Sequence, residues 1–436
     1  MFGSARRGTA RLGLVLGTIN PSDFRNAYHQ SKRVTLVSFA SSQKQNYLRL
    51  VDALRPHWRD DFRLPDRIQK LLSRDKRFGS RDRRLYRELL YTTLRFLPWI
   101  EPLLESDPDK AAATVAWLAA DLKSTRSYRA ELTTDWPELP PSLEATAEFL
   151  NTKTHDLLPS WLSEECPLAY DPTELATLHR RASLWLRLQT DEPQSVTNEF
   201  DQRGWTWKQS DIQPEAIELL AEADVTQTES FRAGAYEVQD LGSQLILETA
   251  NIALSSQWLD ACAGAGGKTL QIARMIGDEG SVTAHDIRPS ALKELTYRAT
   301  RANLKNVSIT TTPEGQHYDG ILIDAPCSGS GTWRRAPHLK AITTPDIISD
   351  NVALQSELLE RFSHLLRPRG QLIYATCSLN RSENEGVIRN FLSNHPEFTV
   401  SPPKENFGYQ DGPHGLSIMP ALHNTDGFFV ANLTRT

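Results

Sequence analysis

The glycine-rich segment at residues 258–268 limits the possible folds of this chain more than any other feature. Its sequence is WLDACAGAGGK, in which a short apolar run ends in Asp260 and a loop of small residues follows. Lys268 then begins a stretch with apolar residues at helical spacing. A strand, a glycine turn and a helix form the first unit of nucleotide-binding α/β domains, because glycine lets the backbone approach a ligand and the helix N-terminus offers free N–H groups.

A phosphate-binding P-loop is one alternative for this turn. Gly267, Lys268 and Thr269 match the end of that motif, and Asp324 ends an apolar stretch suited to a magnesium-binding strand. The motif also requires a glycine five residues before Gly267, where this chain has Cys262. The match therefore fails at a residue on which the tight turn depends. A packing turn without a ligand is the other alternative.

Downstream of this turn, strands and helices alternate. The sequence predicts strands at residues 281–286, 306–312, 318–326, 369–377 and 426–435, with amphipathic stretches between most of them. Such alternation is typical of a doubly wound, mostly parallel sheet of the α/β class. We therefore expect a Rossmann-like catalytic domain over residues 233–436.

The upstream half has a different pattern. Apolar residues recur at helical spacing in residues 44–140, which predicts an all-α domain that ends at the proline-rich sequence LTTDWPELPPS. Residues 141–232 predict a linker helix and a small α+β module, with a strand at 184–190 and a helix at 215–223. The arginine-rich tail at residues 1–43 stays unassigned, because a transit peptide and a disordered extension both fit it.

Composition narrows the function classes. The formal charge of −5 means that any contact with nucleic acid must come from a local basic patch. Residues 63–95 contain eleven Lys and Arg against four Asp and Glu, which suits either a solvated helix face or a phosphate-binding face. No apolar run approaches the ~20 residues of a membrane span. The four cysteines have no metal-type spacing, so we expect a cytoplasmic chain without a metal site or a membrane partner.

Three residues follow predicted strands of the α/β sheet. With the apolar run before the glycine turn counted as the first strand, Asp286 ends the second strand, where an acid hydrogen-bonds the ribose of a nucleoside-bearing cofactor. Cys327 and Cys377 lie at the ends of the fourth and fifth strands, 318–326 and 369–377. If those strands are neighbours, ~5 Å apart, both thiols face one pocket at the carboxyl edge of the sheet. Ser382, Glu383 and Asn384 are expected to cap the helix after Cys377.

The motifs around these residues resemble those of the RNA (cytosine-5)-methyltransferases of the RsmB/NOP (Fmu/Sun) type. The resemblance covers residues 234–436 and is carried by DAPCSGSG (324–331), TCS (376–378), ENE (383–385), VQDLGSQ (238–244), DACAGAGGKT (260–269), RRAPHLK (334–340) and DGFFVANL (426–433). Residues 72–95 look like a divergent NusB-like RNA-binding domain, and residues 161–232 like the family's small RRM-like module.

This resemblance implies a class I methyltransferase domain, a cofactor and a mechanism. The cofactor is S-adenosylmethionine, and the residues expected to hold it are Cys262, Ala263, Gly264, Ala265, Gly266, Gly267, Lys268, Asp286 and Asp324. By the family pattern, Cys377 adds to carbon 6 of cytosine and Cys327 helps to remove the proton from carbon 5. Asp324 and Lys268 donate to the ring edge and stabilise the adduct.

The resemblance also implies RNA as the partner, with small-subunit ribosomal RNA favoured over tRNA, and we expect a monomer. Two departures from the family pattern are visible: Ala265 replaces a common proline, and Glu314 is the one acid near the end of the third strand. A P-loop-like ATPase and an RNA-binding protein without activity remain the alternatives from other classes.

Overall fold

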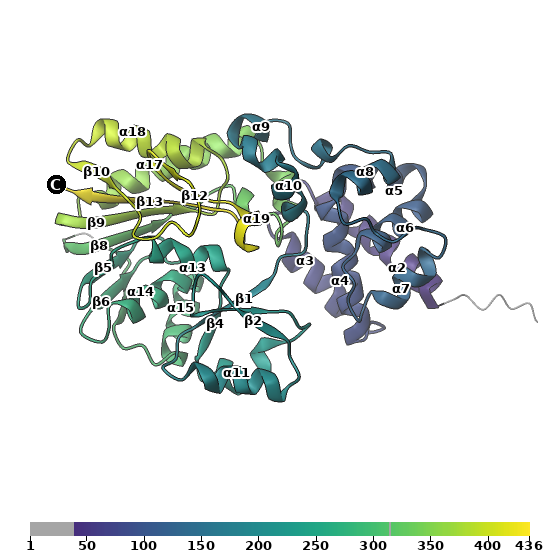
Figure 1. Ribbon diagram of the computed structural model, residues 1–436, viewed down its shortest axis with the longest axis horizontal. Helices are drawn as coiled ribbons and strands as arrows, with labels where there is room; N and C mark the ends of the chain where they lie inside the picture. The colour runs from purple at the N-terminus through teal and green to yellow at the C-terminus, as the bar shows by residue number, and fades with distance from the viewer. Residues whose placement is uncertain (1–38, 314) are drawn as a thin grey trace, which may run out of the picture.

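The structure, a computed structural model, describes residues 39–313 and 315–436. The unassigned tail up to residue 38 and Glu314 lie outside the described residues. Figure 1 shows a helical part on one side, a large sheet with its helices on the other, and a small sheet beside the large one. The domain boundaries expected from the sequence stay predictions.

The first part of the chain is helical. The fully buried Leu85 and Leu89 form one apolar face of a helix and pack in the same core as Tyr47. Truncating such a leucine to alanine costs about 2–5 kcal/mol. The helices are α2 (Phe39–Leu54), α3 (Leu64–Arg74), α4 (Ser80–Arg95), α5 (Leu97–Ser106), α6 (Pro108–Leu118), α7 (Arg126–Leu132), α8 (Leu143–Leu150), α9 (Leu162–Glu165) and α10 (Pro172–Leu178).

Local sequence explains where several of these helices begin. Asp107 precedes α6 and accepts a hydrogen bond from the Lys110 N–H at 3.0 Å, and Pro108 occupies the first helical position. The proline-rich segment lies between α7 and α8, where the ring of Trp136 packs against those of Trp117 and Phe149. Helices therefore continue on both sides of that segment and share its aromatic contacts.

The small sheet is antiparallel and has the order β2-β3-β1-β4. Its strands are β1 (Leu184–Leu188), β2 (Trp207–Gln209), β3 (Ala216–Leu219) and β4 (Tyr236–Val238), with α11 (Pro193–Gln202) and α12 (Glu229–Arg232) beside them. The helix predicted at residues 215–223 is wrong, because β3 occupies this segment. Pairing on both sides of β3 outweighs the helix propensity of its Glu, Leu and Ala residues.

The large sheet has nine strands among the described residues, in the order β11-β12-β13-β9-β8-β5-β6-β7, and β10 also pairs with β13. The strands are β5 (Gln257–Asp260), β6 (Ser281–Ala284), β7 (Val307–Ile309), β8 (Tyr318–Asp324), β9 (Leu366–Thr376), β10 (Phe398–Ser401), β11 (Asp411–Gly412), β12 (Gly415–Ile418) and β13 (Phe428–Arg435). The central strands β5 to β9 run parallel, and β13 is antiparallel to β9.

Helices cover both faces of the large sheet, as the alternating sequence pattern predicted. In Figure 1, α17 (Pro345–Ser363) and α18 (Val387–Asn394) lie on one face, and α13 (Leu241–Glu248), α14 (Gly267–Met275) and α15 (Pro289–Arg301) lie on the other. The short α16 (His338–Ile342) and α19 (Pro420–His423) contact the helical part. The fold is therefore a Rossmann-like, doubly wound α/β sheet preceded by a helical part.

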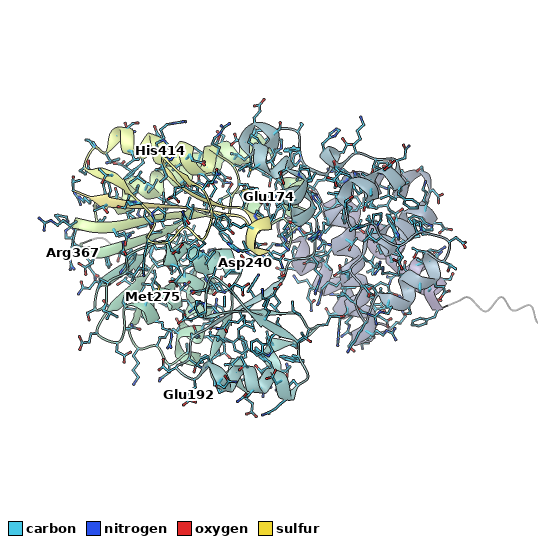
Figure 2. The ribbon with its side chains drawn as sticks, viewed as in Figure 1. Glu174, Glu192, Asp240, Met275, Arg367 and His414 are labelled. Atoms are coloured by element: carbon cyan, nitrogen blue, oxygen red, sulfur yellow. The ribbon has the colours of Figure 1, made fainter. Side chains whose placement is uncertain are left out.

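Buried polar contacts join the helical part to the large-sheet part. Glu174 of α10, labelled in Figure 2, accepts a hydrogen bond from the Ala421 N–H of α19 at 3.0 Å. The Lys340 ammonium group lies 2.7 Å from the Arg95 carbonyl and 2.9 Å from His179 Nε2. Burial and the nearby Arg95 charge lower the pKa of Lys340 to about 7. Since the Lys340 contacts are buried, they fix α4 and the end of α10 against the catalytic part.

No helix among the described residues is both long enough and apolar enough to cross a membrane.

Candidate active site

The glycine loop lies over the carboxyl ends of the parallel strands, between β5 and α14. Gly264 and Gly266 have φ values of 54° and 91°, a region that glycine adopts without steric cost. A Cβ atom at Gly266 would lie 2.7 Å from the Leu295 side chain. The missing side chain at Gly266 therefore lets α15 pack against the loop, which fixes the loop's position.

The two residues that could have belonged to a P-loop bind carboxylates instead. Lys268 Nζ lies 2.8 Å from Asp324 Oδ2, and Thr269 Oγ1 donates to Asp260 Oδ2 at 2.6 Å. In the first pair the lysine is the donor and Asp324 is the acceptor, and the roles of both groups toward a substrate stay predictions. Burial raises the pKa of Asp260 to about 7, even though the Thr269 hydroxyl favours its ionised form.

Asp286 follows β6 and faces the glycine loop. Its carboxylate accepts hydrogen bonds from the Gly264 N–H at 2.8 Å and from the Arg288 guanidinium at 2.9 Å. Burial opposes its ionisation, but these hydrogen bonds outweigh burial and hold the pKa of Asp286 below its ordinary value. Each carboxylate oxygen can accept more than one hydrogen bond, so this arrangement does not prevent contact with a ribose.

The two cysteines meet at the ends of neighbouring strands. β8 and β9 are adjacent and parallel, with Asp324 opposite Ala375 in the register. Cys327 Sγ lies 3.3 Å from Cys377 Sγ, within hydrogen-bond distance for sulfur. The expectation that both thiols would face one pocket depended on these strands being neighbours, and the sheet order confirms that they are.

The surroundings of the two thiols push their pKa values in opposite directions. A hydrogen bond from Cys327 lowers the pKa of Cys377 against the effect of burial, and Arg335 and Lys268 lower it further. The hydrogen bond to Cys377 and burial raise the pKa of Cys327, and the Glu383 carboxylate adds to this increase. The pair therefore favours a thiolate at Cys377 and a thiol at Cys327.

Glu383 holds the two cysteine loops together. It is fully buried in a single π-helical turn, Ser382–Gly386, that precedes α18, and is therefore not simply a helix cap. Its carboxylate accepts hydrogen bonds from the Ser328 N–H at 2.8 Å and from the hydroxyls of Ser328 and Ser378 at 2.5 Å. Asn380 Nδ2 donates to it at 2.9 Å. Because Ser328 follows Cys327 and Ser378 follows Cys377, these bonds set the positions of both thiols.

The Cys327 loop also needs its glycines. Gly329 has a φ of 68°, and a Cβ atom at Gly331 would lie 2.0 Å from the Gly427 carbonyl oxygen. Instead, the Gly331 carbonyl accepts a hydrogen bond from the Gly427 N–H at 2.8 Å, and the Gly331 N–H donates to the Cys377 carbonyl at 3.0 Å. This close backbone approach ties the loop to the start of β13.

The glycine loop, Asp286, Asp324 and both thiols line one cavity of about 780 Å³. Ile287, which is 85% exposed, and three apolar residues of α17 form an apolar wall suited to an adenine ring: Leu354, Leu358 and Phe362. One oxygen of the buried Asp260, Oδ1, has no hydrogen-bond partner among the described residues. The unpaired carboxylate oxygen of Asp260, the glycine loop and the apolar wall fit S-adenosylmethionine, and the cavity has room beside the thiols for a nucleobase.

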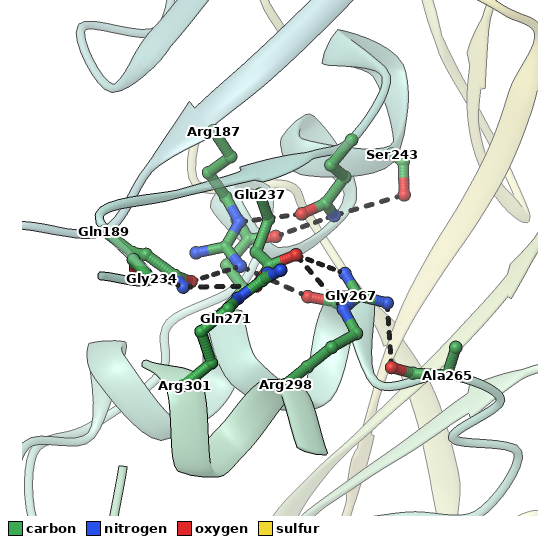
Figure 3. Close-up of polar contacts among 11 residues, drawn as sticks. Arg187, Gln189, Gly234, Glu237, Ser243, Ala265, Gly267, Gln271, Arg298 and Arg301 are labelled. Atoms are coloured by element: carbon green, nitrogen blue, oxygen red, sulfur yellow. Dashed lines mark hydrogen bonds and ion pairs between the residues drawn. The ribbon is translucent and has the colours of Figure 1, made fainter. Parts of the chain in front are cut away.

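A cluster of buried charges supports the glycine loop from behind (Figure 3). Glu237 of β4 accepts two hydrogen bonds from Arg298, at 2.9 and 3.1 Å, and another from Arg301, both arginines of α15. Arg298 Nη1 in turn donates to the Ala265 carbonyl at 2.8 Å. On the other side Arg187 donates to the Gly267 carbonyl at 3.4 Å. The small sheet thus holds the loop through arginine side chains.

Most of the residues predicted for the site come together. Cys262, Ala263, Gly264, Ala265, Gly267, Lys268, Asp286, Asp324, Cys327 and Cys377 line the cavity. Gly266 is not among the cavity's lining residues and instead makes room for Leu295. Sequence reasoning missed Glu237 and Arg298, although a charged residue inside a short apolar strand was a signal. It also missed Arg335, which the RRAPHLK motif contains.

Comparison with known proteins agrees with this geometry. The model of a family described as 16S rRNA methyltransferase RsmB/F matches residues 246–434. A probable ribosomal RNA small subunit methyltransferase B of Bacillus subtilis is 27% identical over 422 residues, which is 84% of this chain and 94% of that protein. The ribosomal RNA small subunit methyltransferase B of Photorhabdus laumondii is 32% identical over 308 residues, 65% of this chain and 68% of that protein.

One solved structure with the same fold contains a ligand. It is titled NSun6 from Pyrococcus horikoshii with SFG, and it aligns with a TM-score of 0.55 over 68% of this chain and 98% of its own. At 18% sequence identity, this similarity shows a shared fold.

Proposed function

This chain belongs to the 16S rRNA methyltransferase RsmB/F family, and from that premise we propose that it methylates carbon 5 of a cytosine in small-subunit ribosomal RNA. It is an S-adenosylmethionine-dependent rRNA methyltransferase of the RsmB/F type. One observation carries the finer proposal: two thiols with unlike pKa shifts lie 3.3 Å apart on the cavity that the glycine loop lines.

Cys377 is the proposed nucleophile. Carbon 5 of cytosine reacts poorly until a group adds to carbon 6. The Cys377 thiolate supplies the electron pair of a new bond from sulfur to carbon 6, and the ring electrons shift toward N3 and carbon 5. The lowered pKa of Cys377 supports this role, because more of the thiol is ionised near neutral pH.

Lys268 and Asp324 are proposed to hold the ring edge. The lysine donates a hydrogen bond toward the negative charge that forms on the ring, and the Asp324 carboxylate accepts one from the exocyclic amino group. Their 2.8 Å ion pair keeps both groups beside the thiols. When bound, S-adenosylmethionine supplies the methyl group that carbon 5 takes. A paired cytosine must first leave its helix to enter a cavity of this kind.

Cys327 is proposed to release the product. In the free protein the Cys377 thiolate raises the pKa of Cys327. Once Cys377 is bonded to carbon 6, that charge is gone, and Cys327 loses its proton to solvent more readily. Its thiolate then takes the proton from carbon 5. The electrons of that carbon–hydrogen bond restore the ring double bond, and the sulfur–carbon electrons return to Cys377.

Bisulfite sequencing of RNA from cells with and without the gene tests the substrate. We expect one cytosine of small-subunit ribosomal RNA to lose its protection when the gene is deleted. Loss of protection in tRNA alone would assign the same chemistry to tRNA. Unchanged protection in both RNAs would refute the proposal.

Two variants test the covalent mechanism. Cys377→Ala removes the nucleophile, so no adduct forms and no methyl group is transferred. Cys327→Ala permits attack and transfer but slows release, so the protein should accumulate joined to RNA through Cys377. Denaturing gels after incubation with RNA and S-adenosylmethionine should show a shifted band for Cys327→Ala only. Methylation that persists in both variants without an adduct would eliminate the mechanism.

A further inference from the structure

A second cavity adjoins the catalytic one. Its volume is about 400 Å³, and it shares Val238, Asp240 and Arg335 with the catalytic cavity. All three parts of the chain form its walls: α4 and the segment at 181–183 from the helical side, β1 and β4 from the small sheet, and residues 334–335 from the catalytic part. Asp240, labelled in Figure 2, lies where these parts meet. The mechanism above does not use this cavity.

The charged groups of the second cavity are layered, with arginines exposed and acids beneath them. The Arg181 side chain is 53% exposed and lies 3.3 Å from Glu88, whose side chain is 8% exposed. The Arg335 side chain is 49% exposed and lies 3.0 Å from Asp426, whose side chain is 1% exposed. The cavity therefore presents guanidinium groups to a ligand, and guanidinium groups bind phosphates well.

α4 adds a cation and an aromatic ring one helical turn apart. Arg87 is exposed and donates a hydrogen bond to Gln69, a neutral side chain, and no acid among the described residues forms an ion pair with it. Tyr91 is half-buried in the cavity wall, and Val238, which is 46% exposed, lies in the same wall. Single-stranded RNA is bound by this combination, since bases stack on aromatic rings while cations contact the backbone.

We propose that the second cavity holds the nucleotide next to the target cytosine, in single-stranded form, while the cytosine lies in the catalytic cavity. This inference rests on the proposed function, because it requires an RNA substrate. Arg335 lines both cavities and would contact the phosphate between the two nucleotides. Arg87 and Arg181 would contact the next phosphate, and Tyr91 would stack on the base. A volume of about 400 Å³ suits one nucleotide and excludes a base-paired duplex.

The first test changes the RNA. Two hairpins of the ribosomal RNA region located by bisulfite sequencing are compared: in one the target cytosine and its neighbours lie in a loop, and in the other the cytosine is a single bulge between paired neighbours. We expect kcat/KM to be at least about tenfold lower for the bulge, because its neighbours must unpair to enter the cavity. Equal values for the two hairpins would overturn the proposal.

The second test changes the cavity. Arg87→Glu should weaken binding of the loop hairpin about tenfold and reduce the slope of log Kd against log salt by about one. Tyr91→Ala should weaken binding about fivefold and leave the slope unchanged, because a stacking contact carries no charge. Arg389→Glu is the matched control: Arg389 is exposed on α18, and the substitution makes the same charge change away from both cavities.

The outcomes separate the two proposals. If Arg87→Glu binds RNA like Arg389→Glu and Tyr91→Ala binds like the wild type, the second cavity is not a nucleotide site, whatever the enzyme methylates. If the wild type methylates no cytosine, the proposed function fails, and binding of a single-stranded RNA oligonucleotide by the same variants still decides the cavity. Unchanged Kd for S-adenosylmethionine in both α4 variants shows that the catalytic part remains folded.

Discussion

Two buried glutamates support the two halves of the active site, and their partners differ in kind. Glu237, behind the glycine loop, is 2% exposed and binds the guanidinium groups of Arg298 and Arg301. Glu383, behind the cysteine loops, is fully buried and accepts hydrogen bonds from neutral hydroxyl, amide and carboxamide groups such as Ser328 and Asn380. Ion pairs hold the cofactor half, and neutral donors hold the cysteine half.

Because of this difference, we expect Glu237 to affect mainly the stability of the protein and Glu383 to affect mainly the reactivity of the thiols. Glu237 is paired with two arginines and is not among the main charges that shift the pKa of either thiol, so Glu237 acts through structure. A carboxylate with neutral donors keeps its negative charge, and Glu383 lies close enough to contribute to the raised pKa of Cys327, after the Cys377 hydrogen bond and burial. Substituting each glutamate by glutamine should therefore give different phenotypes.

The largest expected effect is on stability. Glu237→Gln leaves Arg298 and Arg301, whose side chains are 15% and 6% exposed, without a counter-charge. Removing one partner of a buried ion pair costs about 3–5 kcal/mol. We expect urea unfolding to show a loss near the lower end of that range. The control Asp191→Asn removes a carboxylate that is 93% exposed from Arg274 and should cost about 1 kcal/mol or less. Equal losses would show that the arginines are solvated.

The next effect is on the rate. Glu383→Gln replaces an acceptor by an amide that must place an N–H against the donors of Ser328 and Ser378, so the cysteine loops shift. A misplacement of about 1 Å costs about 100-fold in rate, and we expect that loss in kcat with little change in the Kd for S-adenosylmethionine. Glu385→Gln, two residues away and half-buried, is the control. Methyl transfer and calorimetry measure the two quantities, and a loss confined to cofactor binding would contradict the comparison.

The sequence predicted the positions of the two cysteines better than it predicted the residues that hold them in place. Cys327 and Cys377 were found because each follows an apolar strand, and strand ends in a parallel sheet lie at one edge. Glu383 was interpreted as a helix cap, since its partners Ser328 and Ser378 become neighbours only when β8 and β9 pair. The helix predicted at residues 215–223 failed for the same reason: its segment pairs with strands that local propensity does not reveal.

A smaller effect should isolate the contact between α15 and the glycine loop. The Arg298 guanidinium binds Glu237 and the Ala265 carbonyl together, and a lysine ammonium in its place reaches only one of them. Arg298→Lys should weaken binding of S-adenosylmethionine about fivefold, measured by calorimetry, and leave kcat at saturating cofactor unchanged. Arg301→Lys is the control, because Arg301 also binds Glu237 but packs on the Phe231 ring, whereas Arg298 contacts the glycine loop. Equal weakening in both would assign the effect to the ion pair.

The smallest effects are shifts in pH dependence, and the two glutamates should again differ. The rate of Cys377 alkylation by iodoacetamide, followed by mass spectrometry against pH, reports its thiolate. Cys327→Ala removes the hydrogen bond that lowers the pKa of Cys377, so the profile should move to higher pH. Glu383→Gln removes a negative charge that opposes ionisation of the thiol pair, so the profile should move to lower pH. Glu237→Gln should leave it in place, because Glu237 is not among the main charges that shift the pKa of either thiol. Shifts of the same sign in the first two variants would show that geometry, and not charge, controls the thiols.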